Sequence, residues 1–413
     1  MSAVEGWKTC RLGNLVEVEG GFAFKSADFD DGGIPIIRMS DLDNGHLDLS
    51  GSVRIKSNQL KALSKFALHT GDFLVGMSGS IGIYAIVRKQ DLPAYLNQRV
   101  GRFRLTDESL ADYDFITQIA RSKPYELHVE MLAAGAAQVN ISPSQIESFS
   151  FDLPPKPEQT KIAKILSTVD RAIEQTEALI AKQQRIKTGL MQDLLTRGID
   201  EHGNLRSEQT HKFKDSPLGR IPIEWDVEKW SQVCSKIQDG THFSPRTDSS
   251  AEFKYVTSKN IKFGFLDLSD VEYIDKRQHD EIYKRCDVCF GDVLLTKDGA
   301  NTGNAAINLL NEEFSLLSSV ALIRPLKSKL TSMLLLQTIL SKSGQRLIKD
   351  SMSGLAITRV TLEIINNFLM KVPPVEEQES IGQFLAVQDE RVKSEAKKLA
   401  RLRALKTALM QDL

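Results

Sequence analysis

The chain repeats itself at an interval of 219 residues, and this duplication limits the possible folds more than any other feature. The clearest match joins residues 153–194 to residues 372–413 without a gap. Both segments open with a Pro-Pro pair and then a Glu-Gln pair, and they close on 187–194 and 406–413, where seven of eight positions are identical. A period this long indicates two copies of a domain rather than a solenoid of short repeats.

The repeat continues more faintly through the rest of each half. The segment 45–50 lies 219 residues before 264–269, and 71–74 lies 220 before 291–294. A chain of 413 residues is long enough for two or three domains, each with its own core. The sequence therefore predicts two copies of one unit, each a globular part followed by a long helix.

The matched segments carry the hydrophobic pattern of a coiled coil. Mostly apolar residues recur at alternating steps of four and three, which is a heptad seam. The polar seam positions Thr176, Gln183, Gln388 and Glu395 would fix its register at some cost in stability. The seam positions are 162, 166, 169, 173, 176, 180, 183, 187, 190 and 194, and the same positions plus 219. A helix of about 39 residues is about 58 Å long and needs its seam buried to be stable. The helices could pack on their own domains, but their matching seams favour pairing with each other.

The globular parts are predicted to be mixed, with strands dominant. Short runs of β-branched and aromatic residues indicate strands. The expected strands are 34–39, 72–76, 83–87, 293–296 and 320–323, the expected helices are 111–121 and 331–342, and the polar stretch 199–224 is expected to be a linker.

Composition excludes several classes of protein. No apolar run reaches the roughly 18 residues of a membrane span, and the N-terminal residues have no secretory pattern. Four cysteines cannot form a disulfide framework, which favours a reducing cytoplasm, and the lone CxxC at 286–289 makes a poor zinc site. No Gly-Lys dipeptide occurs, so there is no P-loop. The sequence thus offers no convincing catalytic, cofactor or metal site.

Two loop regions recur in both halves and could bind DNA. The glycine-rich run 76–82 is matched by 296–303, and 135–142 is matched by 354–361. Backbone N–H groups in such loops can approach an anion, while Gln or Asn can pair with adenine and Arg with guanine. Each loop alone is more easily explained as surface structure, but the recurrence favours a function.

With these features the chain resembles the specificity subunit of a type I restriction–modification system. The resemblance rests on the paired Pro-Pro…Glu-Gln helix starts, the matched helix ends, the run 216–225 (SPLGRIPIEW) and the run 71–82. It covers essentially the whole chain, and the double repeat is specific to that family.

The resemblance implies an α+β fold with a pseudo-two-fold internal repeat. Two similar, strand-dominated mixed α/β target-recognition domains would be joined by two long helices that form an antiparallel coiled coil. The expected parts are a first target-recognition domain (1–151), a spacer helix (152–197), a linker (198–222), a second target-recognition domain (223–370) and a second spacer helix (371–413).

The resemblance also implies a function without catalysis. Each half would read one part of a bipartite site in double-stranded DNA, and the helices would set the spacing and dock two modification (methyltransferase) subunits. The chain would bind no cofactor itself. S-adenosylmethionine belongs to the modification subunits, and ATP and Mg belong to the restriction (endonuclease) subunits, in a prokaryotic cytoplasm. The alternative is a coiled-coil adaptor without DNA contact.

The predicted DNA-contacting residues come from the recurring loops and their neighbours. The second half departs from the first, since Lys297-Asp298 replaces Met77-Ser78, as expected if the halves read different bases. The full set is Arg38, Ser40, Ser78, Gly79, Ser80, Asn97, Gln98, Arg99, Gln138, Asn140, Asp239, Thr241, His242, Lys259, Asn260, Lys297, Asp298, Asn301, Thr302, Thr358 and Arg359.

Overall fold

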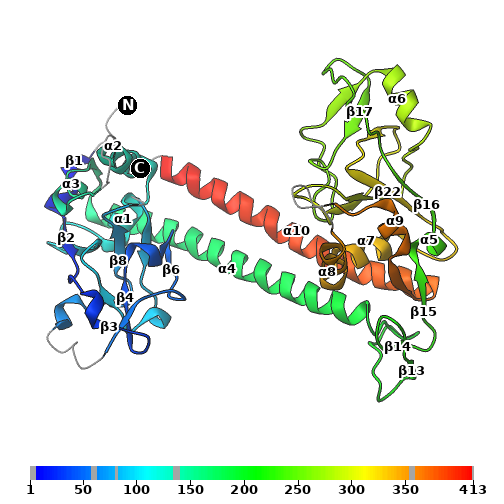
Figure 1. Cartoon of the computed structure of the whole chain (residues 1–413). Coiled ribbons are helices and arrows are strands. Elements are labelled where there is room, and N and C mark those ends of the chain that lie inside the picture. The colour runs from blue at the N-terminus through cyan, green and yellow to red at the C-terminus, as the bar shows by residue number, and fades with distance from the viewer. Residues whose placement is uncertain (1–5, 57–62, 80–81, 134–139, 353–358, 412–413) are drawn as a thin grey trace. The chain divides into compact units, whose positions relative to one another are not determined.

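The computed structural model describes residues 6–56, 63–79, 82–133, 140–352 and 359–411. The chain divides into two compact units, which are described separately. The first unit comprises Met1–Glu177 with Lys397–Leu413, and the second comprises Ala178–Ala396. Each unit therefore holds one globular domain and parts of both long helices, which are labelled α4 and α10 in Figure 1.

The domain of the first unit is built on two four-stranded sheets and a two-stranded one. The central antiparallel sheet has the order β2-β11-β8-β9, the second sheet has the order β10-β4-β7-β3, and β1 pairs with β12. The bounds are β1 Lys8–Arg11, β2 Val16–Gly20, β3 Phe29–Asp30, β4 Ile34–Ile37, β7 Arg54–Ile55, β8 Phe73–Gly76, β9 Tyr84–Ile86, β10 Tyr95–Leu96, β11 Val100–Leu105 and β12 Ser150–Leu153. A small hairpin joins β5 (Leu42–Asp43) and β6 (His46–Leu47).

Three helices contribute to one hydrophobic core of this domain. They are α1 Tyr113–Ile119, α2 Lys123–Ala133 and α3 Pro143–Ile146. Phe73, Phe103 and Phe115 are fully buried in this core, which also takes in Ala163 from the start of α4. Burying a large apolar side chain contributes about 1.5–3 kcal/mol, so the domain and the helix start stabilise one another.

The domain of the second unit repeats this topology, except that the sheet equivalent to β10-β4-β7-β3 has three strands. Its central sheet has the order β16-β22-β19-β20, a three-stranded sheet has the order β18-β17-β21, and β15 pairs with β23. The strands are β13 Phe213–Lys214, β14 Ile221–Pro222, β15 Asp226–Lys229, β16 Cys234–Asp239, β17 Phe253–Val256, β18 Glu272–Ile274, β19 Val293–Thr296, β20 Ala305–Ile307, β21 Ser315–Leu316, β22 Val320–Pro325 and β23 Leu369–Val372. The helices are α5 Trp230–Val233, α6 Lys276–Tyr283, α7 Ser332–Leu340, α8 Lys342–Asp350 and α9 Leu362–Asn367.

The predicted duplication and the strand-dominated mixed fold are thus confirmed. The expected strands appear as β4, β8, β9, β19 and β22, and the expected helices as α1 and α7. None of the described helices is long and apolar enough to span a bilayer.

The two long helices are α4 (Lys156–Leu194) and α10 (Val375–Gln411), and the predicted seam is confirmed on both. Every described seam position is buried or half-buried, whereas most other positions in the middle of each helix are exposed. Leu413, the last seam position, lies outside the described residues. A seam that stays covered while its flanks meet solvent is typical of two paired helices.

Ion pairs join the two long helices within each unit. In the first unit Lys406 Nζ lies 2.6 Å from Asp170 Oδ1, and in the second unit Lys187 pairs with Asp389. Asp389 is Asp170 plus 219, and Lys406 is Lys187 plus 219. The two contacts are therefore the same contact made twice, as expected of a pseudo-two-fold antiparallel coiled coil.

A buried glutamine attaches the start of each helix to its domain. Gln159 in α4 accepts a hydrogen bond from Asp112 N (2.9 Å) and donates to Pro154 O (2.9 Å). Gln378 in α10 makes the equivalent bonds to Thr331 N (2.8 Å) and Pro373 O (2.8 Å). Both glutamines are completely buried, so losing either side chain would leave backbone groups without partners.

The stretch 199–224 is more structured than the predicted linker. It contains the β13–β14 hairpin, and its Arg206 forms an ion pair with the buried Glu377 at 2.5 Å. Glu377 also accepts hydrogen bonds from Trp225 Nε1 (3.0 Å) and Ile199 N (2.9 Å). A buried carboxylate needs such partners, and they hold this stretch against the start of α10. The polar composition of the stretch concealed this role.

Two glycines allow close crossings of the backbone at the ends of β2 and β16. A Cβ at Gly21 would lie 2.1 Å from Leu96 O, and a Cβ at Gly240 would lie 1.9 Å from Leu316 O. Any side chain at either position would force the crossing segments apart. The two glycines are 219 residues apart, so the crossing itself is duplicated.

We predict that Gly240→Ala destabilises the second unit by about 3 kcal/mol or more, because the clash is with backbone that cannot move aside. Urea unfolding followed by the fluorescence of the buried Trp225 and Trp230 measures this. The control is Gly189→Ala in α4, where a Cβ would meet nothing within 4 Å; it should stabilise by about 0.5–1 kcal/mol. An unchanged midpoint for Gly240→Ala would contradict the close crossing.

We also predict that a fragment of residues 1–200 forms an antiparallel dimer, because α4 carries both partners of the repeated contact. Asp170 of one copy would face Lys187 of the other, twice per dimer. Light scattering should show a dimer that Lys187→Asp weakens roughly tenfold or more, because it sets a second carboxylate against Asp170 at both contacts. A folded fragment that remains monomeric at every concentration would argue against seam pairing.

Candidate nucleic-acid interface

Chain segments that are far apart in sequence meet at one end of the central sheet in the first unit. Phe22 N donates to Leu96 O (3.0 Å), and Gln98 N donates to Phe22 O (3.0 Å). Met77 N donates to Arg99 O (3.1 Å), and Ile141 N donates to Met77 O (2.8 Å). Residues 20–22, 76–79, 96–99 and 140–141 thus form a continuous set of backbone bridges, which we call the first ladder.

The second unit builds the same arrangement. Thr241 N donates to Leu316 O (2.8 Å), and Ser318 N donates to Thr241 O (2.8 Å). Lys297 N donates to Ser319 O (2.8 Å), and Val360 N donates to Lys297 O (2.8 Å). Residues 239–241, 296–299, 316–319 and 359–360 form the second ladder, bond for bond equivalent to the first.

The first ladder gathers most of the predicted residues of the first half. Gln98, Arg99 and Asn140 are exposed, Asn97 is half-buried, and Ser78 is buried beside Asn140. At Gly79 the backbone has φ +72°, so the chain turns away from the ladder in a conformation that favours glycine. Ser80 and Gln138 lie outside the described residues. The side chains that remain are amides, a guanidinium and a hydroxyl, which suit hydrogen bonding to base edges or phosphates.

The second ladder contains a charged network where the first has Gly20 and Met77. The buried Asp239 accepts from Arg285 Nη2 (2.5 Å) and lies 3.5 Å from Lys297 Nζ. Its carboxylate is also 3.4 Å from Nε2 of the exposed His242. Lys297 Nζ is a further 3.0 Å from Asp298 Oδ2. These pairs fix the buried charges of Asp239 and Lys297 in place, so both hold the ladder in position.

The remaining predicted residues lie beside the ladders. Asn97 N donates to Ile37 O (3.2 Å), so Arg38 and Ser40 follow a strand that borders the first ladder. In the second half Lys259 pairs with Glu272 (3.2 Å), Asn301 is exposed, and the Thr302 hydroxyl donates to Gly299 O (2.7 Å). Thr358 lies outside the described residues, and Arg359 is exposed at the edge of the second ladder.

Asn260 is buried and bonded inside its own domain, whereas a DNA contact requires an exposed side chain. Its side chain is 2 % exposed, accepts from Thr257 N (3.0 Å) and donates to Asp267 O (3.1 Å). The amide holds a turn together, so we leave Asn260 out of the DNA-contacting set proposed below.

The structure also adds residues that the sequence analysis missed. Phe22 is 38 % exposed in the first ladder, and Ser318 and Ser319 take the places of Gln98 and Arg99 in the second. The 220-residue offset could have found both serines. Among the described residues, Thr296 Oγ1, Asp298 Oδ1 and Ser319 Oγ are buried in the second ladder without a hydrogen-bond partner. Unpaired polar atoms of this kind often mark a place where water or a ligand completes the bonding.

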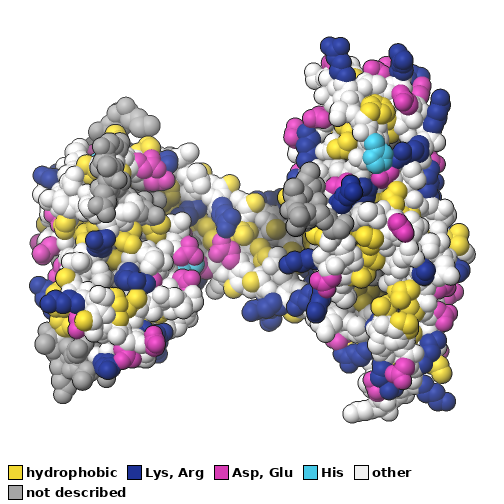
Figure 2. All heavy atoms as spheres, in the orientation of Figure 1, with side chains coloured by type: hydrophobic (Ala, Val, Ile, Leu, Met, Phe, Trp, Pro, Cys, Tyr) yellow, Lys and Arg dark blue, Asp and Glu magenta, His cyan; other side chains and the backbone are white. Residues whose placement is uncertain are grey.

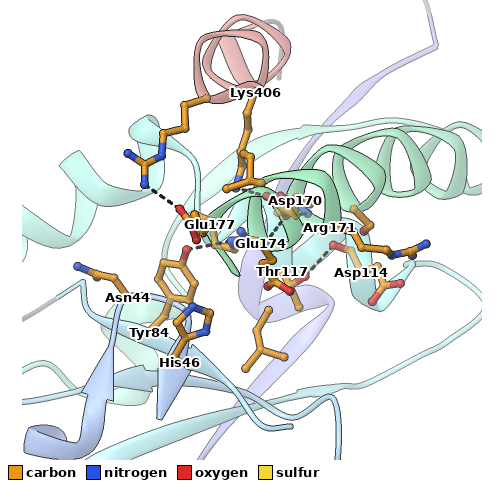
Figure 3. Close-up of a pocket in the computed structure, with 17 residues that line it drawn as sticks. Asn44, His46, Tyr84, Asp114, Thr117, Asp170, Arg171, Glu174, Glu177 and Lys406 are labelled. Atoms are coloured by element: carbon orange, nitrogen blue, oxygen red, sulfur yellow. Dashed lines mark hydrogen bonds and ion pairs between the residues drawn. The ribbon is translucent and has the colours of Figure 1, made fainter. Parts of the chain in front are cut away.

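A separate polar hollow of about 440 Å³ lies beside the helix pair in the first unit (Figure 3). Asp170 lines this hollow and pairs there with Lys406 (Figure 3). Its carboxylate also accepts hydrogen bonds from Arg121 Nη1 (2.8 Å) and Gln118 Nε2 (2.9 Å). Burial alone would raise the pKa of Asp170, but these cations and the hydrogen bond from Gln118 hold it below its ordinary value. The carboxylate stays ionised and joins α10 to α4 and α1. The charged residues of the hollow therefore hold helices together.

Metal binding finds no support in the described part of the chain. No three or more His, Cys, Asp or Glu side chains gather there in a way that could hold an ion. In the CxxC segment, burial raises the pKa of Cys286 to about 12, whereas Cys289 is exposed. A thiol that remains protonated is a poor zinc ligand.

The comparisons with known proteins agree with this duplicated architecture. A family model described as the type I restriction modification DNA specificity domain matches residues 4–183 and again residues 222–404. The chain is 23 % identical to the putative type I restriction enzyme MjaX specificity subunit of Methanocaldococcus jannaschii, over 99 % of this chain and 93 % of that protein. It is 24 % identical to the type I restriction enzyme EcoBI specificity subunit of Escherichia coli, over 92 % of this chain and 79 % of that protein.

Solved structures show the same fold. The S subunit of a type I restriction–modification system from M. genitalium superposes with a TM-score of 0.63 at 15 % identity, covering 99 % of this chain and 97 % of that one. A chain from a structure of type I R-M complex assembly and conformational transition superposes with a TM-score of 0.53 at 17 % identity, covering 100 % and 98 %. Two matches to one family model, together spanning most of the sequence, settle the assignment: the chain belongs to the type I restriction–modification DNA specificity family.

Proposed function

We propose that this chain is the DNA-recognition subunit of a type I restriction–modification complex, in which each half reads one part of a bipartite site. It acts without catalysis of its own, as its family membership indicates. The observation that carries the proposal is the duplicated ladder, because two equivalent backbone frames that carry different polar side chains suit two separate half-sites.

The ladders offer the right chemistry for reading bases. Asn97, Gln98, Arg99 and Asn140 present amides and a guanidinium from one rigid sheet end. Because the bridges already fix the backbone, only the side chains lose freedom on binding, and their hydrogen bonds can discriminate between bases. The second ladder presents Ser318 and Arg359 from the same frame, and a different set of side chains would read a different half-site.

The charge of the chain suggests that other subunits of the complex supply part of the contacts to the DNA phosphates. The formal net charge is −1, and on the face shown in Figure 2 basic and acidic side chains are interspersed over both domains. Affinity for DNA rises with the number of phosphates neutralised, so this chain alone should bind weakly. Two modification subunits that carry S-adenosylmethionine would supply the missing phosphate contacts and the methyl transfer. Restriction subunits that use ATP and Mg would join the complex through them.

The helix pair provides a surface for two copies of one partner. Ile165 and Phe384 are large exposed apolar residues 219 positions apart, and Ile186 and Leu405 form a second such pair. Each unit therefore presents one apolar residue from near the start of one helix and one from near the end of the other. A surface that occurs twice by internal repeat fits two identical partners, which we take to be the modification subunits.

The rival function is a coiled-coil adaptor without DNA contact. It would explain the helix pair and the exposed apolar residues, but not the two equivalent ladders. Pull-down from a pool of random duplexes, in the presence of the modification subunit, separates the two. Enrichment of one split sequence supports DNA recognition, and an unenriched pool supports the adaptor.

We predict that Ile186→Glu with Phe384→Glu removes one of the two modification subunits, because it places charge in one of two equivalent apolar contacts. Native mass spectrometry should then find one modification subunit per chain instead of two. Gln184→Glu, at an exposed position of the same helix, is the matched control and should retain two. Retention of both by the double variant would place the docking surface elsewhere.

We predict that lengthening both helices moves the half-sites apart. Four residues inserted after Ala181 and four after Ala400, its equivalent, extend each helix by about 6 Å, or at most about two base pairs. Because each base pair also rotates one half-site around the duplex, an increase of one base pair is the expected result. The half-sites themselves should not change, since the ladders are untouched.

Selection from DNAs with varied spacers measures the change. The control carries the same four residues after Gly219, at the exposed tip of the β13–β14 hairpin, and should keep the original spacer. If the helix variant also keeps it with undiminished affinity, the helices do not measure the site.

A further inference from the structure

We propose that the residues that close the two ladders, Asn140 and Arg359, are the equivalent base-reading residues of the two halves. Asn140 forms hydrogen bonds to adenine, and Arg359 forms hydrogen bonds to guanine. Asp298 positions the guanidinium of Arg359. This inference rests on the proposed function and adds to it the residue in each half that selects one base, and the base selected.

The backbone places the two residues at the same point of each domain. Ser78 and Asn140 form an antiparallel bridge, and so do Asp298 and Arg359. The adjoining hydrogen bonds, Ile141 N to Met77 O and Val360 N to Lys297 O, are both 2.8 Å long. The side chains of Asn140 and Arg359 therefore start from equivalent positions and differ only in their chemistry.

Both positions lie at the open end of their ladder. Just beyond the bridge the backbone turns away at Gly79 (φ +72°) and at Gly299 (φ +89°), and a Cβ at either glycine would meet nothing within 4 Å. Asn140 and Arg359 are themselves exposed. Within the part of the chain that the structure describes, each ladder therefore ends in an exposed side chain that can enter a groove of DNA.

The two side chains match different bases. The amide of Asn140 offers one acceptor and one donor, which fit N6 and N7 of adenine in the major groove. The guanidinium of Arg359 offers two parallel donors, which fit O6 and N7 of guanine. Each pairing is bidentate, so one residue is enough to distinguish its base from the other three.

The residue paired with each reader across its β-bridge supports the assignment of adenine to Asn140 and guanine to Arg359. Opposite Asn140 stands Ser78, which is buried and neutral, as suits a neutral amide. Opposite Arg359 stands Asp298, whose Oδ2 receives Lys297 Nζ at 3.0 Å and whose buried Oδ1 has no hydrogen-bond partner among the described residues. That free oxygen can accept from the guanidinium and leave the two outward N–H groups for guanine.

The same carboxylate argues against a phosphate contact by Arg359. A phosphate beside Asp298 would bring two negative charges together, whereas guanine O6 and N7 are neutral acceptors. Lys297 does not offset this, because its side chain is 9 % exposed and already lies between Asp239 and Asp298. An arginine backed by an aspartate is therefore directed to a base.

The test exchanges the two residues in the specificity–modification complex. Asn140→Arg and Arg359→Asn are each challenged with DNAs randomised at both half-sites, and the selected sequences and methylated positions are read. In the first variant one adenine of the first half-site should become guanine, and in the second one guanine of the second half-site should become adenine. The preference for the original base should fall about tenfold or more, and the other half-site should be unchanged.

Further variants separate a reading role from a structural one. Asn140→Ala should lose preference at the same single position without gaining a new one. Asp298→Asn should weaken the guanine preference in the wild-type background and have no further effect in Arg359→Ala, as expected of a positioning residue. Unfolding midpoints confirm that each variant remains folded.

The outcomes distinguish this inference from the proposed function. If the wild-type complex selects no split site, the proposed function fails. If it does, but both exchanges keep the wild-type bases with full preference, Asn140 and Arg359 are not the readers and the inference is overturned. Equal loss of preference at both half-sites would likewise overturn it, because the residues would then act on the structure as a whole.

Discussion

A completely buried glutamine side chain joins the start of each long helix to its own domain by hydrogen bonds, in addition to the apolar contacts made there. Gln159 and Gln378 have no solvent exposure, and each bonds both to the Pro-Pro pair before its own helix and to the N-cap residue of a domain helix. An amide can do this because it donates and accepts at the same end, and leaving the bonded backbone groups unpaired would cost about 1–3 kcal/mol each. In each unit the ladder is thereby held at a fixed orientation to the helix that leaves it.

The repeated ion pairs between α4 and α10 fix how the two attached helices align with each other. Asp170 with Lys406 and Asp389 with Lys187 are one contact repeated, so the same pairing holds the helices in both units. These ion pairs are half-buried, so desolvation of the charges offsets much of their Coulomb attraction and their contribution to stability is modest. Their value here is register, since a shifted pairing would separate both pairs together. A fixed register is what the proposed role of the helices in setting the distance between half-sites requires.

The sequence predicted the features that periodicity and repetition carry. The duplication, the heptad seam and strands such as β8 and β19 were all predicted, because burying an apolar face leaves a regular pattern along the chain. Single polar side chains leave no such pattern. The Glu-Gln pair at each helix start was visible as a repeat, but only the structure shows that Gln378 and Glu377 are buried and which groups they bind.

The candidate site was predicted in part for the same reason. The loops ending at Asn140 and Arg359 were found because they recur, and the ladders bring them beside Ser78 and Asp298. Asn260 looked equally suitable in the sequence, yet its amide is used inside a turn. Whether a polar side chain is free to contact DNA depends on its hydrogen-bond partners in the folded domain. Those partners cannot be read from the neighbouring sequence.

The central claim is that two independent reading modules are held by one antiparallel helix pair. Its most direct test is to co-express the chain with its modification subunit in a host without adenine methylation and to sequence the methylated bases. The account predicts one split motif with two different halves, a gap of constant length, and one methylated adenine in each half on opposite strands. A contiguous motif, a gap of variable length, or methylation on one strand only would contradict it.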